Sequence, residues 1–159
     1  MPSKKHDDAD RAPLRRRSIS EALCHVLGNT CRIAATTQSF YWNVTGPQAA
    51  SLKSIFAVQY REMHDALDRI AMRSRALGEF VAQDYSDAVL LPTLLAISSS
   101  KSDQMLKILI EAHEASLLSL DAAMDVADAY QDRTTVALLA NREEVQGQHL
   151  LDLRSVLQG

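Results

Sequence analysis

The stretch Val44–Gly78, VTGPQAASLKSIFAVQYREMHDALDRIAMRSRALG, decides the fold. It opens with Gly46 and Pro47, a pair that stops a helix because proline has no backbone N–H to donate. Apolar residues then recur with the 3.6-residue period of a helix. The pattern predicts a helix from about Ser51 to Leu77, about 40 Å long at 1.5 Å per residue. Gly78 is the expected C′ residue that ends it.

Three more helices are predicted from the same period. They run from an N-cap at Ser18 or Ser20 to Trp42, from about Ser102 to Tyr130, and from the turn at residues 131–135 to about Leu157. Residues 79–100 form the longest connection, and the apolar run VLLPTLLAIS within it predicts a short extra helix. Four long helices with one long middle connection indicate an all-α, ferritin-like four-helix bundle, because that fold needs a crossover.

The composition fits one globular domain. The chain has 159 residues, 47% of them hydrophobic and 23% charged, with only five glycines and four prolines. No apolar run approaches the length of a membrane span, and the N-terminus has no apolar segment of a secretory signal, so we expect a cytoplasmic protein without membrane contact. Cys24 and Cys31 would lie about 10 Å apart along one helix, which is too far for a disulfide. They read as small buried side chains in a reducing compartment.

Charge is spread unevenly along the chain. Residues 1–17 are expected to form a flexible tail, separate from the bundle at 18–159. The tail carries six basic and three acidic residues, a net +3, which leaves −6 on the remainder. The basic residues are Lys4, Lys5, Arg11, Arg15, Arg16 and Arg17, and the acidic ones are Asp7, Asp8 and Asp10. A basic arm on an acidic body is typical of proteins that contact DNA phosphates. The alternative is a solvated tail with no specific partner.

The sequence offers few residues for metal or catalytic chemistry. Ferritin-like bundles often hold iron with Glu-x-x-His pairs, and this chain contains none. Its five histidines, His6, His25, His64, His113 and His149, are not closely paired in sequence. No nucleophile constellation, phosphate-binding glycine loop or zinc-ligand spacing is present. His113 and His149 are expected to be packing or hydrogen-bonding groups.

The run FYWNVTGPQAASLKSIFAVQYREMHDALDRIAMRSRALG (Phe40–Gly78) resembles the signature of the Dps family, the DNA-protecting mini-ferritins of starved bacteria. That signature reads roughly His-Trp-Asn-Val-x-Gly-Pro, then Leu-His, Tyr-x-Glu and Asp-x-x-Ala-Glu-Arg, ending Leu-Gly. The resemblance continues through HEA at 113–115, QDRTTVALL at 131–139 and LRSVL at 153–157. It implies a hollow homo-oligomer, a dodecamer with tetrahedral symmetry, that handles iron and coats DNA.

The resemblance also implies a ferroxidase site shared between two subunits. Two histidines come from one chain, and an aspartate and a glutamate come from its partner. Carried onto this sequence, the histidine positions hold Tyr41 and Lys53, the aspartate position holds Asp68, and the glutamate position holds Met72. Three of the four ligands are therefore replaced. A protonated ammonium group cannot bind ferrous iron, so the site reads as degenerate.

Two hypotheses concern what occupies the vacated positions. In the first, Lys53 of one chain pairs with Asp68 of the other and takes the place of the metal. Tyr41 would then hydrogen-bond nearby, and Met72 would fill the space of the glutamate. The alternative is that Lys53 points to solvent. In the second, His64, Asp65 and Asp68 hold a metal weakly, since residues four apart share a helix face.

Other family positions also differ. A pore aspartate falls on Ala137, and a His-Glu-Lys run falls on Gln146, Gly147 and Gln148. A Trp-Met-Leu-Arg run falls on Leu151, Asp152, Leu153 and Arg154, of which Arg154 matches. Trp42 and Arg154 read as structural residues.

The sequence therefore predicts a Dps-like cage subunit that protects DNA under stress or starvation, with iron as a possible cargo and no confident cofactor. Two alternatives stay open. One is an active mini-ferritin that oxidises and stores iron through other ligands. The other is a structural helical subunit that joins a functional Dps in mixed shells.

Overall fold

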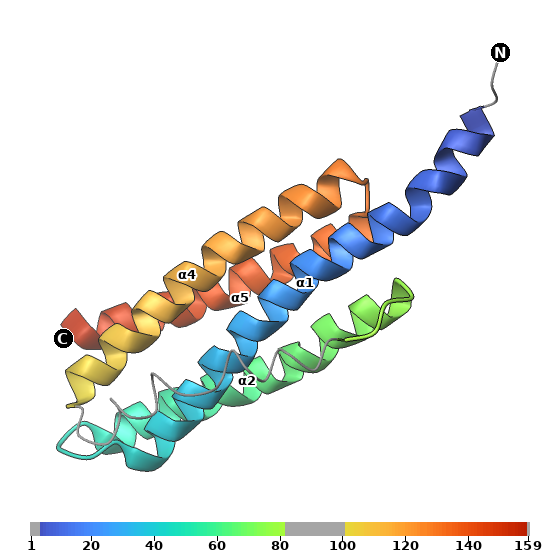
Figure 1. Ribbon diagram of the computed structural model, residues 1–159. Helices are drawn as coiled ribbons and strands as arrows, with labels where there is room; N and C mark the ends of the chain where they lie inside the picture. The colour runs from blue at the N-terminus through green and yellow to red at the C-terminus, as the bar shows by residue number, and fades with distance from the viewer. Residues whose placement is uncertain (1–3, 82–100, 159) are drawn as a thin grey trace.

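The computed structural model describes residues 4–81 and 101–158, with side chains from residue 12 onward. Four α-helices make up the bundle (Figure 1). They are α1 (Lys4–Asn43), α2 (Ala49–Ala76), α4 (Ser102–Ala129) and α5 (Arg133–Gln158). Their bounds agree with the expected helices to within a few residues, except at the start of α1. The short extra helix expected in the run VLLPTLLAIS lies outside the described residues.

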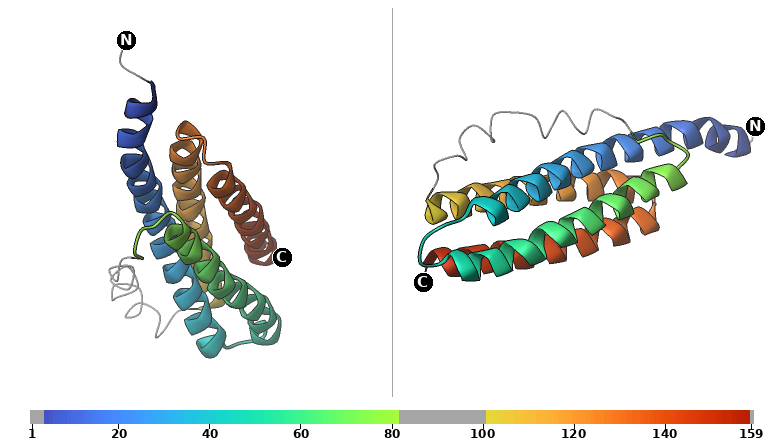
Figure 2. Two further views of the ribbon diagram at one scale, coloured as in Figure 1. Left: turned by 90° about the vertical axis from the view of Figure 1, so that its right-hand side faces the viewer. Right: turned by 90° about the horizontal axis from the view of Figure 1, so that it is seen from below.

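The connectivity is that of a bundle with one crossover. α1 and α2 form one antiparallel hairpin through the turn at residues 44–48, and α4 and α5 form a second through residues 130–132 (Figures 1 and 2). α1 packs on α4 and α2 packs on α5, so the two hairpins close into one bundle. The end of α2 and the start of α4 lie at opposite ends of the bundle (Figure 1). The all-α, ferritin-like topology expected from the long middle connection is confirmed.

The start of α1 differs from the prediction. The helix begins at Lys4, well before the N-cap expected at Ser18 or Ser20, and its first turns extend past the end of the bundle (Figure 1). The segment contains no glycine, and its six Lys and Arg residues and two alanines are good helix formers. Extending a formed helix is also far easier than nucleating one. Pro13 lies inside the helix. The assignment of residues 1–17 to a separate, flexible tail stays a prediction.

Two similar turns end α2 and α4. At the end of α2, Glu79 N–H donates to Ser74 O (3.3 Å) and Gly78 N–H to Arg75 O (3.0 Å), with Gly78 at φ 93°. This is the Schellman pattern, so the predicted C′ role of Gly78 is confirmed. After α4, Asp132 N–H donates to Ala127 O (2.9 Å) and Gln131 N–H to Asp128 O (2.8 Å). There Gln131 takes the C′ position at φ 57° without being a glycine.

A buried ion pair ties the end of α2 to the start of α5. Asp132 caps α5, since its side chain accepts a hydrogen bond from Thr135 N–H at 3.1 Å. Arg73 donates to both carboxylate oxygens of Asp132, at 2.8 and 2.7 Å, and to Thr135 Oγ1 at 2.8 Å. Burial alone would raise the pKa of Asp132, but the hydrogen bonds from Thr135 and Arg73 outweigh it and hold that pKa below its usual value.

The apolar core is divided along the bundle axis. One cluster fills the end near the α1–α2 turn and consists of Phe40, Val44, Leu52, Phe56, Met105, Leu106, Leu109 and Leu153. A second fills the other end and consists of Ile19, Leu23, Val26, Leu27, Ile70, Leu120, Ala123 and Leu139. A small patch of Ile33, Ala34 and Met63 lies between them. The rest of this middle level is polar, which matters for the sites described next.

Candidate functional site

The residues at the family's ligand positions are spread along the outer side of α1 and α2. Lys53, His64, Asp68 and Met72 are exposed on α2, and Met72 keeps 67% of its surface accessible. Successive spacings of eleven, four and four residues place these side chains on one side of a helix. Lys53 and Asp68 lie fifteen residues apart on α2, about 22 Å along its axis, so they cannot pair within one chain. A Lys53–Asp68 bridge therefore needs a second subunit.

Tyr41 reaches this face from the end of α1. Its ring lies 5.5 Å from that of Tyr60, centroid to centroid, and the Tyr60 ring meets His64 edge-on at 6.2 Å. The guanidinium of Arg61 lies 5.6 Å from the centre of the Tyr60 ring, within cation–π range. Tyr41 thus joins an aromatic row that leads to His64.

A hollow of about 510 Å³ lies beside His64, Asp65 and Asp68, and Leu27, Leu67, Ala71 and Val81 complete its lining. Within the described part of the chain, no three His, Cys, Asp or Glu side chains come close enough to hold a metal ion. A single chain therefore offers His64, Asp65 and Asp68 as neighbours on a shared hollow, not as a formed metal site. Further ligands would have to come from another subunit.

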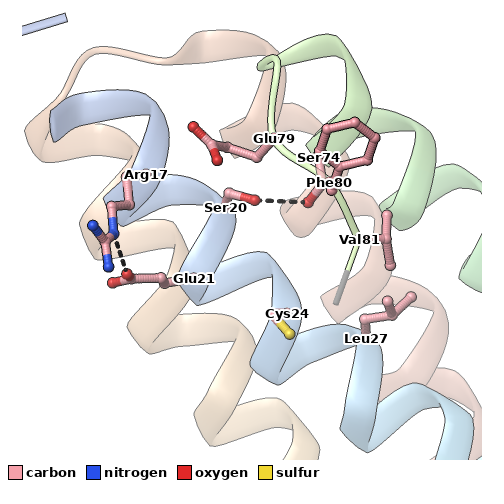
Figure 3. A pocket seen from close by; sticks show the side chains of 9 residues that line it. All are labelled: Arg17, Ser20, Glu21, Cys24, Leu27, Ser74, Glu79, Phe80 and Val81. Carbon is pink, nitrogen blue, oxygen red and sulfur yellow. Dashed lines mark hydrogen bonds and ion pairs between the residues drawn. The ribbon is translucent and has the colours of Figure 1, made fainter. Parts of the chain in front are cut away.

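The neighbouring hollow, of about 320 Å³, also lies between α1 and α2 and shares Leu27 and Val81 with the first (Figure 3). Ser20 donates to Ser74 Oγ across it at 3.3 Å, and Arg17 pairs with Glu21 on its rim at 3.0 Å. Cys24 faces this hollow. Cys24 and Cys31 are both free thiols and half-buried, so the expectation of full burial was wrong. α1 leaves them at the edge of the bundle instead of turning them into the core.

The basic residues expected to contact DNA lie on the first part of α1. Arg15, Arg16 and Arg17 are exposed on the stretch that precedes Ile19, the first fully buried side chain of the described part of α1. Lys4, Lys5 and Arg11 belong to the same helix. The structure thus presents the arginines at one end of the bundle on a projecting helix (Figure 1).

The bundle interior holds a polar layer that sequence reasoning missed. Seven side chains form it between the two apolar clusters: Gln59, Glu62, His113, Ser116, Arg142, Gln146 and His149. They come from α2, α4 and α5. Arg142 is fully buried and binds Glu62 with two hydrogen bonds, one of them from Nη2 to Oε2 at 3.0 Å. Arg69 donates to the same carboxylate from the surface side at 3.1 Å. A buried arginine needs such a partner, because an unpaired charge in the core costs several kcal/mol.

His113 and His149 meet inside this layer. Their rings lie 5.8 Å apart, centroid to centroid, in a T-shaped arrangement. Burial lowers the pKa of His113 to about 3, and His149 and Arg142 add to the effect while Gln146 opposes it. Burial also lowers the pKa of His149, although Glu62 and Asp152 oppose the shift more than Arg142 supports it. Both imidazoles are therefore neutral at pH 7. His113 lies on α4 and His149 on α5, so the sequence does not show that they meet. Only the packing of the two helices brings their rings together.

The structure also shows the surroundings of three other positions that the Dps resemblance singled out, Trp42, Ala137 and Arg154. Arg154 pairs with Glu114 at 2.5 Å on the surface, which agrees with a structural role. Trp42 is 62% exposed, so any packing role for it requires a neighbouring subunit. Ala137 is exposed on α5. Among the described residues, no helix is long and apolar enough to cross a membrane.

Comparison with known proteins identifies the family of this chain and two of its relatives. The family model for ferritin-like domains matches residues 20–159. An uncharacterized low temperature-induced protein of Nostoc sp. (strain PCC 7120) is 26% identical over 147 residues, which are 91% of this chain and 82% of that protein. A homologous protein of Anabaena variabilis matches equally well.

Solved structures with the same fold include Dps proteins. DpsC from Streptomyces coelicolor has a TM-score of 0.82 and 21% sequence identity, covering 90% of this chain and 85% of that one. Dps from Thermosynechococcus elongatus has a TM-score of 0.81 and 22% identity, covering 92% and 94%. At these identities the likeness establishes the fold and leaves the chemistry to the residues described above.

Proposed function

Because the chain belongs to the family of ferritin-like domains, with the fold of Dps proteins, we propose that it is a Dps-like cage subunit whose intersubunit ferroxidase centre is largely lost. The observation that carries this proposal is the outer face of α1 and α2. It keeps Asp68 but offers Tyr41, Lys53 and Met72 where ligands would be needed. In this proposal the particle acts by assembling and by covering DNA in stressed cells, in the cytoplasm or nucleoid, with iron as a possible cargo.

The same face supports assembly. Val58 and Met72 of α2 are 65% and 67% exposed, and Trp42 at the end of α1 is 62% exposed. Large apolar side chains left on one side of a subunit are typical of surfaces that pack on a partner. Two such faces brought together would place Lys53 of one chain opposite Asp68 of the other. Pairing these two charges would leave neither of them buried alone.

Assembly is tested by the mass of the purified particle in sedimentation velocity. Twelve chains of 17.6 kDa would give about 211 kDa. A stable monomer or dimer at micromolar concentration would contradict the cage, and a shell that forms only with a second, paralogous subunit would favour the mixed-shell alternative. Lys53→Glu should weaken assembly, since it would set two carboxylates against each other, and Lys53→Glu with Asp68→Lys should restore it.

Iron chemistry is tested by anaerobic titration with ferrous iron, followed by hydrogen peroxide. The proposal expects no saturable high-affinity binding and no acceleration of iron oxidation above the rate of a protein-free control. Saturable binding with fast oxidation would contradict the degenerate site. Loss of that activity in His64→Ala or Asp68→Asn would then assign it to the hollow that these two residues border.

DNA binding is tested by the salt dependence of affinity for a duplex of mixed sequence. Each phosphate neutralised by Lys or Arg adds about 0.9 to the slope of log K against log salt concentration. Arg15→Gln, Arg16→Gln and Arg17→Gln together should therefore lower that slope. A particle carrying many such arms would amplify weak contacts through effective concentration. Unchanged binding in the triple variant would exclude the α1 arm as the contact.

A further inference from the structure

An open groove lies between α1 and α4, separate from the hollows that α1 forms with α2. Its volume is about 430 Å³, and most of its lining side chains are small: Ser18 and Ala22 of α1, and Ser119, Ala122 and Ala123 of α4. Glu21 also lines it. Such small side chains leave room for a larger apolar side chain from outside the chain. Exposed apolar hollows of this kind are typical of surfaces that receive a partner.

Leu14 lies on the same face of α1, one helical turn before the groove. It precedes Ser18 by four residues and Glu21 by seven, and residues at these spacings share a helix face. Leu14 is 59% exposed, on the part of α1 that projects past the bundle (Figure 1). It is followed by three exposed arginines, Arg15, Arg16 and Arg17. The arm (residues 12–17) therefore presents one large apolar side chain bordered by positive charge.

The groove is bordered by negative charge. Asp121 and Asp125 are exposed on α4, one residue before and three residues after Ala122, which lines the groove. From Leu117 to Ala129, α4 contains three aspartates and neither lysine nor arginine. An apolar groove with an acidic border is therefore complementary to an apolar side chain with a basic border. Such complementarity steers association and suppresses wrong partners.

We propose that the arm of one chain docks on the α1–α4 groove of a second copy of this chain. Leu14 would fill the groove, and the arginines of the arm would pair with Asp121 and Asp125. Leu14 and Ala22 are eight residues apart on one helix, a rise of about 12 Å. Two copies laid antiparallel can therefore exchange arms, so that each Leu14 enters the groove of the other copy. The same patch then serves on both copies, as a two-fold axis requires.

DNA phosphates and the acidic border of the groove would both attract the arm. Phosphates would pair with Arg15 and Arg16 but would give Leu14 no apolar contact. The groove accounts for the leucine and the arginines together, so a second copy is the occupant that these observations favour. The two reciprocal contacts make a small interface, which suits a weak association that salt suppresses. They use the α4 side of α1, so they link whatever particle the chain forms and do not depend on the proposed cage.

The experiment is sedimentation velocity of the full chain, without DNA, over a range of protein concentrations at about 0.15 M and about 0.01 M salt. The Debye length rises from about 8 to about 30 Å between these conditions. We expect the basic particle, whatever its mass, to associate further as its concentration rises, and more tightly at low salt. Leu14→Asp should weaken this association by roughly tenfold or more, as for a central apolar contact. Leu151→Asp changes an equally exposed leucine, at 59% on α5, and should leave the association unchanged.

Charge reversal supplies a test that a damaged fold cannot mimic. An arm variant carries Arg15→Glu and Arg16→Glu, and a groove variant carries Asp121→Lys and Asp125→Lys. Each should fail to self-associate, because like charges then face each other at both contacts. Mixing the two variants should restore association, because each arm then meets a groove border of opposite charge.

A control for net charge is Glu143→Lys with Glu144→Lys, which reverses two exposed carboxylates on α5 and should associate like the wild type. A wild type that stays a single particle at low salt would overturn the proposal, and binding of a DNA duplex by such a particle would assign the arm to DNA alone. Equal losses in Leu14→Asp and Leu151→Asp, or no association in the mixture, would also overturn it. The mass of the basic particle tests the cage separately and the titration contains no DNA, so this contact and the proposed function fail independently.

Discussion

Asp132 is one residue on which two helices depend. It caps α5 through Thr135 N–H and accepts two hydrogen bonds from Arg73, which lies in the last turn of α2. Both side chains are largely buried, at 5% and 19% exposure. Water therefore screens this pair far less than it screens the surface pair of Arg17 and Glu21. The contact closes the bundle at the end opposite the α1–α2 turn.

We predict that Asp132→Ala lowers the free energy of unfolding by about 3–5 kcal/mol, because it leaves the Arg73 guanidinium buried without a counter-charge. Urea unfolding followed by circular dichroism measures the loss. Asp132→Asn is the matched control, since asparagine caps helices as well as aspartate does and keeps an acceptor for Arg73. It should cost clearly less. Equal stability of the alanine variant and the wild type would contradict the role given to this contact.

A second prediction at this scale concerns acid. In the folded chain the pKa values of His113 and His149 lie below the ordinary value of 6.5, so the unfolded chain binds more protons as the pH falls. Stability is therefore full above about pH 6.5 and is lost as the pH drops toward the folded values. Each buried histidine adds a slope of up to about 1.4 kcal/mol per pH unit.

Unfolding in urea between pH 7 and 5, with chelator present, measures this slope. His113→Gln is expected to flatten the dependence. A wild-type stability that is constant over this range would contradict the neutral, buried state of both rings.

A third prediction restores the family's ligands. The triple variant Tyr41→His, Lys53→His, Met72→Glu keeps the native Asp68. We expect its peroxide-driven oxidation of ferrous iron to be at least roughly tenfold faster than that of the wild type. Even residues that only support metal ligands change metal affinity or activity by about 10- to 100-fold. Stopped-flow absorbance measures the rate. Adding Asp68→Asn should remove the gain. No gain in an assembled triple variant would show that these four positions do not converge at an interface.

At the scale of the elements, the two Schellman turns differ in one residue. Gly78 adopts φ 93° where α2 ends, as glycine does without strain, whereas Gln131 adopts φ 57° where α4 ends. A left-handed conformation costs a non-glycine residue about 1–2 kcal/mol. Gln131 is exposed, and only its backbone is needed by the hydrogen bonds of the turn.

We predict that Gln131→Gly stabilises the chain by up to about 1 kcal/mol, because relief of strain exceeds the entropy that glycine loses on folding. Gly78→Ala should destabilise by a similar amount. Among the described residues, only Arg16 Nη1, at 4.0 Å, lies near an added Cβ there, so the cost would come from the backbone. Thermal unfolding of both variants tests the pair. Destabilisation by Gln131→Gly would mean that the glutamine side chain contributes a contact.

The elements also show what sequence can and cannot predict. The Gly46–Pro47 break and the apolar period predicted where the helices end and begin around the turns, because those signals are local. Ser18 and Ser20 looked like N-caps, yet both lie inside α1, where Ser20 bonds to Ser74 and Ser18 lies 3.4 Å from the Tyr130 hydroxyl. Serine is polar enough for a cap and small enough for a helix contact. Only tertiary packing decides between the two.

At the scale of the whole molecule, the candidate sites were predictable to different degrees. The outer face of α2 was visible in the sequence, because Lys53, His64, Asp68 and Met72 follow helical spacing within one element. The polar layer was not visible in the sequence, because Glu62, His113, Arg142 and His149 come from three helices. They meet only once the folded chain aligns these helices along the bundle axis. Arg142 in particular reads as a surface residue in sequence but is fully buried.

The division of the core has a thermal consequence. Exposing apolar surface raises the heat capacity of unfolding, and exposing polar surface lowers it. A bundle whose middle level is built from Gln59, Glu62, Arg142 and Gln146 exposes less apolar area on unfolding than one with a continuous apolar core. Its heat-capacity change should therefore fall below the usual value of about 12–15 cal/mol/K per residue. A smaller value flattens the curve of stability against temperature, so this chain would lose less of its stability on cooling than an all-apolar bundle of the same length.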